Sequence, residues 1–188
     1  MMTSPIIRAL DFSLALLGLL AALPVFLIIY LVGLFDTGSP IFYQQRVGKK
    51  GQPFTLIKFR TMGTSTESVA THMVDSNSVT KLGSFLRKTK LDELPQLINV
   101  LRGEMSFVGP RPCLFNQEEL LEERKKRGVL DVLPGITGLA QVNGVDMSVP
   151  VQLAKLDAEM IETFSLSLYF QLILQTATGK GAGDRVRH

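Results

Sequence analysis

The chain of 188 residues has a single cysteine, Cys113, and only two histidines, His72 and His188. One cysteine excludes an intramolecular disulfide and is typical of a protein in a reducing compartment. Two isolated histidines cannot build a His/Cys metal cluster or provide the base of a Ser–His pair. The composition therefore favours neither a His/Cys metal cluster nor a Ser–His pair, and both histidines are expected to be ordinary surface residues.

The chain also lacks a strong excess of either charge, with 20 Lys and Arg against 17 Asp and Glu and a net charge of +3. A mild positive excess favours anionic partners such as phosphates, acidic lipid head groups or nucleic acid, without choosing among them. The length suits one domain with a full core and is short for two. The sequence shows no internal repeat.

No charged residue occurs between Phe12 and Phe35. A straight helix over this run would rise about 36 Å, enough to cross a bilayer core. A cleaved signal peptide fits less well, because the run is long and no small-x-small cleavage site follows it. Pro24 stands at the middle, where it should kink the helix and leave two halves of about 18 Å, each too short to cross.

Basic residues flank this apolar run on both sides: Arg8, Arg46, Lys49 and Lys50. The positive-inside rule prefers such flanks on the cytoplasmic side, which would place both ends on one face of the membrane. The residues alone leave two topologies open with similar weight. One is a single spanning helix, and the other is a re-entrant hairpin that turns at Pro24.

Asp92 and Glu93 are adjacent acids within a basic segment that begins at Arg87. Two neighbouring carboxylates remain ionised when a cation, a helix N-terminus or basic neighbours compensate them. Pro95 predicts the first turn of an amphipathic helix, which places Asp92 at or near its N-cap. A simple helix cap and a catalytic acid are both consistent with this segment.

The segments before the acidic pair read as a hairpin and a short helix. Strands are predicted over Pro40–Val47 and Phe54–Arg60, joined by a turn, so that Lys58 and Arg60 project to one face. A polar loop is predicted over residues 63–80. Leu82, Phe85 and Leu86 then indicate a short amphipathic helix.

Beyond the acidic pair, Gly109-Pro110-Arg111-Pro112 is a stiff link that can hold Arg111 in place at little entropic cost. Gln141 and Asn143 alternate onto one face of an extended segment, where they either bind a base or sugar or satisfy backbone groups. The other predicted elements are a charged, solvated helix over 116–127, a turn over 134–138, helices over 153–164 and 168–178, and a flexible tail over 179–188.

Several motifs occur together in a fixed order: Lys58-Phe-Arg-Thr-Met62, Leu91-Asp-Glu-Leu-Pro-Gln96 after Arg87, Gly109-Pro-Arg-Pro112, and Pro134-Gly-Ile-Thr-Gly-Leu-Ala-Gln-Val-Asn-Gly144. They follow a proline-broken apolar segment. This combination resembles the monotopic phosphoglycosyl transferases, the bacterial sugar transferase family that acts on polyprenol phosphate. The length is similar to that of the minimal members.

The resemblance implies an α+β fold, mostly α. Residues 1–36 would form a re-entrant membrane helix-break-helix, which favours the hairpin at Pro24. Residues 37–178 would form a cytoplasmic catalytic domain of amphipathic helices with a short β-hairpin, at the cytoplasmic face of the bacterial inner membrane. Residues 179–188 would be a flexible tail.

The resemblance also implies an activity: transfer of a sugar-1-phosphate from a UDP-sugar to undecaprenyl phosphate with release of UMP, which starts glycoconjugate assembly. Asp92 would be the nucleophile of a covalent phosphosugar intermediate, with Glu93 beside it and Mg2+ held by this pair. Partners would be the two substrates and the phospholipid membrane, with no nucleic acid and no oligomeric state indicated. The expected substrate- and phosphate-binding residues are Lys58, Arg60, Arg87, Arg111, Gln141 and Asn143.

The chemistry agrees with these residues independently. A carboxylate attacks a pyrophosphate when the repulsion between anions is neutralised, which Mg2+ and fixed cations achieve. The lipid phosphate is already ionised near neutral pH and needs no strong base.

Two positions depart from the family pattern: Val145-Asp146 stands where a basic residue is common, and Leu23 stands where serine often precedes the membrane proline.

The alternative to an enzyme is a membrane-anchored, non-catalytic factor that binds anionic lipid and uses Asp92 only as a helix cap.

Overall fold

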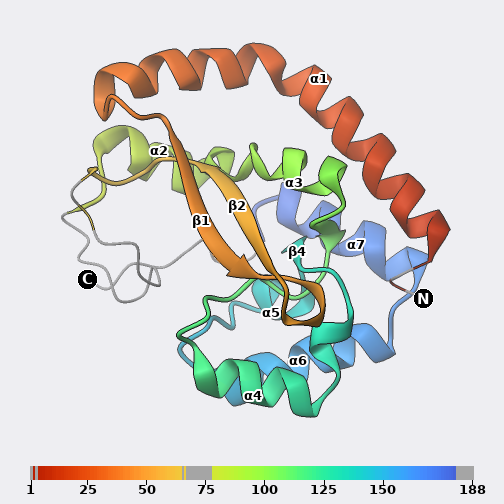
Figure 1. Cartoon of the computed structure of the whole chain (residues 1–188). Coiled ribbons are helices and arrows are strands. Elements are labelled where there is room, and N and C mark those ends of the chain that lie inside the picture. The colour runs from red at the N-terminus through yellow and green to blue at the C-terminus, as the bar shows by residue number, and fades with distance from the viewer. Residues whose placement is uncertain (1, 3, 65, 67–77, 181–188) are drawn as a thin grey trace.

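The computed structural model describes residues 2, 4–64, 66 and 78–180, and the chain is an α+β protein that is mostly helical (Figure 1). His72, His188, most of the predicted loop over 63–80 and most of the predicted tail lie outside the described residues. The elements in chain order are α1 Pro5–Asp36, β1 Ile41–Val47, η1 Lys49–Gly51, β2 Pro53–Phe59, α2 Lys81–Thr89, η4 Leu91–Glu93, α3 Gln96–Arg102, β3 Ser106–Val108, α4 Glu118–Lys126, η5 Val129–Asp131, β4 Gly135–Thr137, α5 Leu139–Val142, α6 Pro150–Glu162 and α7 Leu166–Ala177.

The apolar segment forms one helix, α1, in which Pro24 is an interior residue. Ser4 caps its first turn by accepting a hydrogen bond from the Ile7 N–H, and Pro5 occupies the first turn, where proline is tolerated. The predicted division into two helices at Pro24 is therefore wrong, because proline removes one intrahelical bond while the flanking bonds continue. The helix nevertheless bends, and it arches over α2 and α3 (Figure 1).

The N-terminal end of α1 is fastened to the rest of the protein by polar contacts. Arg8 donates to the carbonyls of Val100 at 2.5 Å and Leu101 at 3.2 Å, which are at the C-terminal end of α3. The buried Asp11 Oδ1 accepts from Ser106 Oγ, the Phe107 N–H and the Tyr169 hydroxyl at 2.9–3.0 Å. Arg8 is thus a docking residue, where the sequence indicated only a charged flank.

The C-terminal end of α1 packs on the same body through apolar contacts. The ring centroids of Phe26 and Phe59 are 4.8 Å apart, and Ile29 is buried in a cluster with Phe59 and Leu86. Gly33 fits closely against Pro40, because a Cβ atom there would lie 2.7 Å from the Pro40 Cβ. Both ends of α1 therefore contact one domain.

The outward side of α1 remains apolar and exposed, and it includes Leu16, Leu17, Leu20, Leu27, Ile28, Leu31 and Phe35. Within the described residues, α1 is the one helix that is long and apolar enough to cross a membrane. An exposed apolar surface of this extent marks a contact with lipid or with another protein.

The predicted hairpin is confirmed to within one residue at each end: β1 and β2 pair antiparallel, with Phe42 opposite Lys58. A second sheet, the parallel pair β3 and β4, was not predicted, and it replaces most of the turn expected over 134–138. Its strands have three residues each, too few to show a periodicity. The close approach depends on glycine, since a Cβ on Gly135 would lie 2.1 Å from the Gly109 nitrogen.

The predicted helices correspond to α2, α3, α4, α6 and α7. One prediction is wrong: residues 139–142 form the short helix α5, not an extended segment. Ala140 of this segment and Leu153 of α6 lie in one buried cluster, so packing against α6 favours the helical conformation. Within α6 and α7 the core-facing residues include Leu153, Met160, Tyr169 and Leu172.

Candidate active site

Three segments that are distant in the sequence bring their charged side chains together around Glu93. The Glu93 Oε1 accepts from Arg111 Nη2 at 2.8 Å and from Lys58 Nζ at 3.4 Å. Lys58 comes from β2, Glu93 from the turn η4 and Arg111 from the link before α4. The three side chains are 11–18% exposed, so their charges interact more strongly than those of surface pairs while a ligand still has access.

Asp92 is 7% exposed and lies in the 3₁₀ turn η4. The helix that follows has Pro95 at its N-cap position and begins at Gln96, so Asp92 lies three residues before that cap and is not the cap itself. Two residues earlier, Lys90 has a left-handed backbone with φ of 59°. Burial lowers the pKa of Lys90, and the nearby Glu93 charge partly opposes this shift. Asp92 is therefore held by a tight turn in a basic environment.

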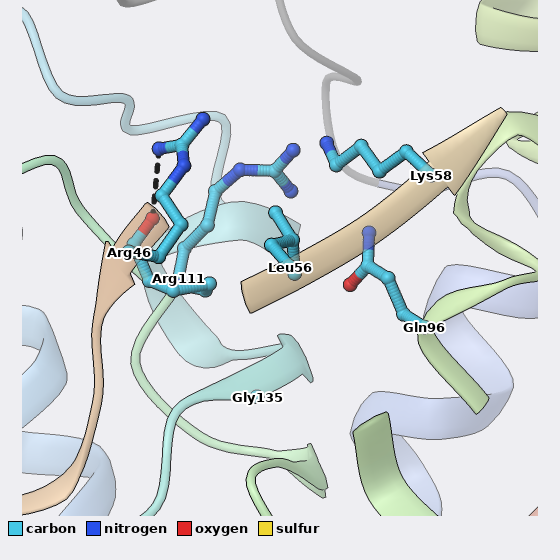
Figure 2. A pocket seen from close by; sticks show the side chains of 7 residues that line it. Arg46, Leu56, Lys58, Gln96, Arg111 and Gly135 are labelled. Atoms are coloured by element: carbon cyan, nitrogen blue, oxygen red, sulfur yellow. Dashed lines mark hydrogen bonds between the residues drawn. The ribbon is translucent and has the colours of Figure 1, made fainter. Parts of the chain in front are cut away.

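A pocket opens beside this cluster, lined by Arg46, Leu56, Lys58, Gln96, Arg111, Pro112 and Gly135. The space among these side chains is about 210 Å³ when open solvent is counted, and its enclosed part holds only about one water molecule. Figure 2 shows the Lys58 ammonium and the Arg111 guanidinium extending toward one another, with the Gln96 amide directed into the same space. Three cations and a neutral amide around a small cavity suit an oxyanion.

The carbonyls of the link that carries Arg111 are held one after another. Gly135 N–H donates to the Pro110 carbonyl and Val47 N–H to the Cys113 carbonyl, each at 2.9 Å. Arg124 Nη1 donates to the Arg111 carbonyl at 2.9 Å, and Arg46 Nη1 to the Pro112 carbonyl at 3.0 Å. This backbone cannot shift without breaking several hydrogen bonds, so the Cα atom of Arg111 is held in place.

Arg124 is itself fixed by Asp157 of α6. Its Nε and Nη2 both donate to Asp157 Oδ2, at 3.0 and 2.7 Å, and the side chains are 3% and 2% exposed. The neighbouring Cys113 is buried, and burial raises the pKa of its thiol despite the opposing charge of Arg124. The thiol therefore stays protonated near neutral pH and is a poor nucleophile.

Arg60 and Arg87 have contacts beside the hairpin. Arg60 Nε donates to the Ser39 carbonyl at 2.8 Å, and its guanidinium lies 5.3 Å from the centroid of Phe42, the residue opposite Lys58. Arg87 Nε donates to Thr61 Oγ1 at 2.9 Å. Neither residue lines the pocket described above, and their roles in phosphate binding stay predictions.

Gln141 and Asn143 lie on the short helix α5 and at its C-cap, so the alternating arrangement expected for them does not exist. Gln141 Nε2 donates to the Ile136 carbonyl at 2.8 Å, and its buried Oε1 has no hydrogen-bond partner among the residues that the structure describes. Their binding of a base or sugar also stays a prediction.

The acidic pair is the part of the site that a magnesium ion would use. Mg2+ is commonly bound through one or two carboxylates together with substrate phosphates. In the described part of the chain, no group of three His, Cys, Asp or Glu side chains is placed to hold an ion. Asp92 and Glu93 therefore fit a metal whose coordination is completed by the substrate, and not a cage built by protein alone.

Sequence reasoning missed Arg46, Gln96, Arg124 and Asp157. For Arg124 a signal existed, because it stands four residues after Leu120, on the buried side of an otherwise charged helix. For Asp157 the similar signal is its place among Leu153, Ala154 and Met160 in the buried stripe of α6. A charged residue on an apolar helix face predicts a buried ion pair, but the sequence does not identify its partner.

Residues 2–180 match the family model described as Bacterial sugar transferase. The uncharacterized sugar transferase EpsL of Bacillus subtilis (strain 168) is 38% identical over 170 residues, which cover 90% of this chain and 84% of that protein. The exopolysaccharide production protein ExoY of Sinorhizobium fredii is 37% identical over 188 residues, covering 90% and 82%. The UDP-glucose:undecaprenyl-phosphate glucose-1-phosphate transferase of Escherichia coli (strain K12) is 46% identical over 142 residues, covering 73% of this chain and 31% of that protein.

Proposed function

This chain belongs to the bacterial sugar transferase family and is a phosphoglycosyl transferase, and we propose that it moves a sugar-1-phosphate from a UDP-sugar to undecaprenyl phosphate and releases UMP. Relatives named for this type of transfer include enzymes of Escherichia coli and Komagataeibacter xylinus. A membrane-anchored, non-catalytic role has no comparable support. The product would be the first lipid-linked intermediate of a glycoconjugate.

The observation that carries the proposal is Glu93 shared between Lys58 and Arg111, next to the buried Asp92. A diphosphate needs fixed positive charge at the reacting phosphorus, and catalysis of phosphoryl transfer is mostly positioning and charge stabilisation. Lys58 and Arg111 already lie around one carboxylate, so a phosphate that enters the pocket meets charges whose positions are set in advance.

In the proposed reaction an Asp92 carboxylate oxygen attacks the phosphorus that bears the sugar. A P–O bond forms to Asp92, the bond to the bridging oxygen breaks, and UMP leaves with that electron pair. An oxygen of the lipid phosphate then attacks the same phosphorus and displaces the Asp92 carboxylate. Mg2+, held by Asp92 or Glu93 together with donor phosphates, would neutralise the diphosphate charge.

The test is trapping of the phosphosugar on Asp92. When UDP-sugar is supplied without lipid acceptor, mass spectrometry of peptides should show an addition of one sugar phosphate at Asp92. The Asp92→Asn variant should fold, show no adduct and release no UMP. Full turnover by that variant, or an adduct on another residue, would contradict the role given to Asp92.

The proposal places the domain on the cytoplasmic face, with α1 entering and leaving the membrane on that side. It is supported by the contacts of both ends of α1 with one domain, through Asp11 and Ile29. A helix of 32 residues is about 48 Å long, so a perpendicular span would carry one end far from the domain. The outward apolar face would lie in the lipid.

Cysteine labelling tests this topology. Met2→Cys and Lys49→Cys should both react with a membrane-impermeant maleimide only from the cytoplasmic side. The parent protein serves as the control, since the buried Cys113 should remain unlabelled. A spanning helix would instead give labelling of the two positions from opposite sides.

A further inference from the structure

Gln96 is the first residue of α3 and lines the pocket, although its side chain is not part of the charged cluster. The residue is 3% exposed. Within the described part of the chain its amide makes no hydrogen bond and no ion pair. Figure 2 shows this amide directed into the pocket, on the side of Leu56 that faces Lys58.

This amide can exchange its contact with water for a contact with a ligand. The Gln96 side chain is enclosed except at its tip, and its polar atoms are not cut off from solvent. Met or Leu would fill the same space at the start of α3 with more apolar burial. An amide that reaches a cavity from an otherwise enclosed side chain is expected where a ligand completes its hydrogen bonding.

The surroundings of the amide indicate the chemistry of that ligand. The other polar side chains that line the pocket are those of Arg46, Lys58 and Arg111, which are donors only. A group held by such donors is an oxyanion with several acceptor oxygens. An amide N–H adds a donor to such an oxyanion without adding charge.

We propose that Gln96 is a substrate-binding residue, whose amide N–H donates to a non-bridging phosphate oxygen of the donor diphosphate that Lys58 and Arg111 neutralise. This inference rests on the proposed function and names one more contact of that site. Gln96 lies four residues after Asp92, so the amide and the nucleophile would approach the same diphosphate from one short segment.

Gln96→Met is the matched substitution, because it keeps the length and approximate volume of the side chain and removes its polar atoms. Binding of UDP, measured by calorimetry, should weaken roughly 10- to 100-fold, the effect of one hydrogen bond to a charged group. The midpoint of thermal unfolding should stay the same or rise, because no hydrogen bond within the described protein is lost. Gln96→Glu should weaken UDP binding further by placing a carboxylate beside the phosphate.

Two controls accompany these variants. Gln45→Met changes an exposed glutamine on β1, whose contact is with Thr55 Oγ1, and should leave UDP binding unchanged. Uridine, which has no phosphate, is the second probe, and Gln96→Met should not change its binding. Gln96→Asn, which withdraws the amide by one methylene, should resemble Gln96→Met and replaces it if that variant does not fold.

Unchanged UDP binding in the Gln96 variants of an active enzyme would overturn the inference. So would an equal loss of uridine and UDP binding, because the amide would then contact the nucleoside. A wild-type protein that neither binds UDP nor releases UMP from any UDP-sugar would instead overturn the proposed function, and the inference with it.

Discussion

Two groups of oppositely charged side chains form ion pairs within this domain, and they differ in their access to solvent. Arg124 and Asp157 form a closed pair, 3% and 2% exposed, between α4 and α6. Glu93, with Lys58 and Arg111, forms an open cluster that is 11–18% exposed. The two are connected through Arg111, whose carbonyl accepts from Arg124 and whose guanidinium donates to Glu93.

This difference in exposure indicates that the closed pair stabilises the fold and that the open cluster belongs to the candidate active site. Charges that are fully removed from water hold a fixed geometry, and breaking such a pair leaves a costly unpaired ion. Charges at a pocket wall keep part of their hydration and can exchange one partner for another. Glu93 thus occupies, between Lys58 and Arg111, a place where substrate phosphates would compete. Substitutions in each cluster, and at an exposed ion pair, test this difference.

The largest effect on stability is expected from the closed pair. Asp157→Ala leaves the Arg124 guanidinium buried without its carboxylate, so the free energy of unfolding should fall by about 3–5 kcal/mol. Urea denaturation measures this change. A loss below about 1 kcal/mol would show that this pair does not stabilise the fold. Arg124→Met with Asp157→Leu should recover much of the stability, yet activity should remain low because the Arg111 carbonyl has lost a donor.

A substitution in the open cluster should change activity strongly and stability only slightly. Glu93→Gln keeps the shape of the side chain but removes its charge. Its amide oxygen can still accept from Lys58 and Arg111, so the free energy of unfolding should fall by about 1–2 kcal/mol, less than in Asp157→Ala. UMP release should fall strongly, since the variant alters the charge beside Asp92. Parallel denaturation and activity assays separate the two quantities. A variant that is as unstable as Asp157→Ala would remove the distinction between the clusters.

The smallest effect is expected at the exposed pair of Glu122 and Lys126 on α4, whose nitrogen and oxygen are 2.9 Å apart with both side chains more than half exposed. Hydrogen bonds from Lys126 to Glu122 and then Glu123 raise the pKa of Lys126. Glu122→Gln should lower that pKa toward its usual value, measured by NMR titration, and leave the thermal midpoint unchanged. A clear drop in the midpoint would show that surface pairs on α4 also support the site.

Much of this arrangement could be predicted because it depends on local patterns. Patterns among neighbouring residues predict the hairpin and the helices with apolar stripes. The motifs from Lys58 to Arg111 are likewise read from short stretches of sequence. The sheet of β3 and β4, the helix at Gln141 and the turn that holds Asp92 could not be predicted, because packing between distant segments decides them. The partner of Arg124 is another such case, since no local rule selects Asp157.

The hydrogen bond between Asp11 and Tyr169 joins residues that are 158 positions apart in the chain. During synthesis at about 5–20 residues per second, α1 emerges roughly 10–30 seconds before its partner exists. The carboxylate of Asp11 therefore lacks this partner until α7 has been made. The N-terminal end of α1 is fully fastened only when nearly the whole chain exists, so a shortened chain that ends before α7 should hold this helix less firmly.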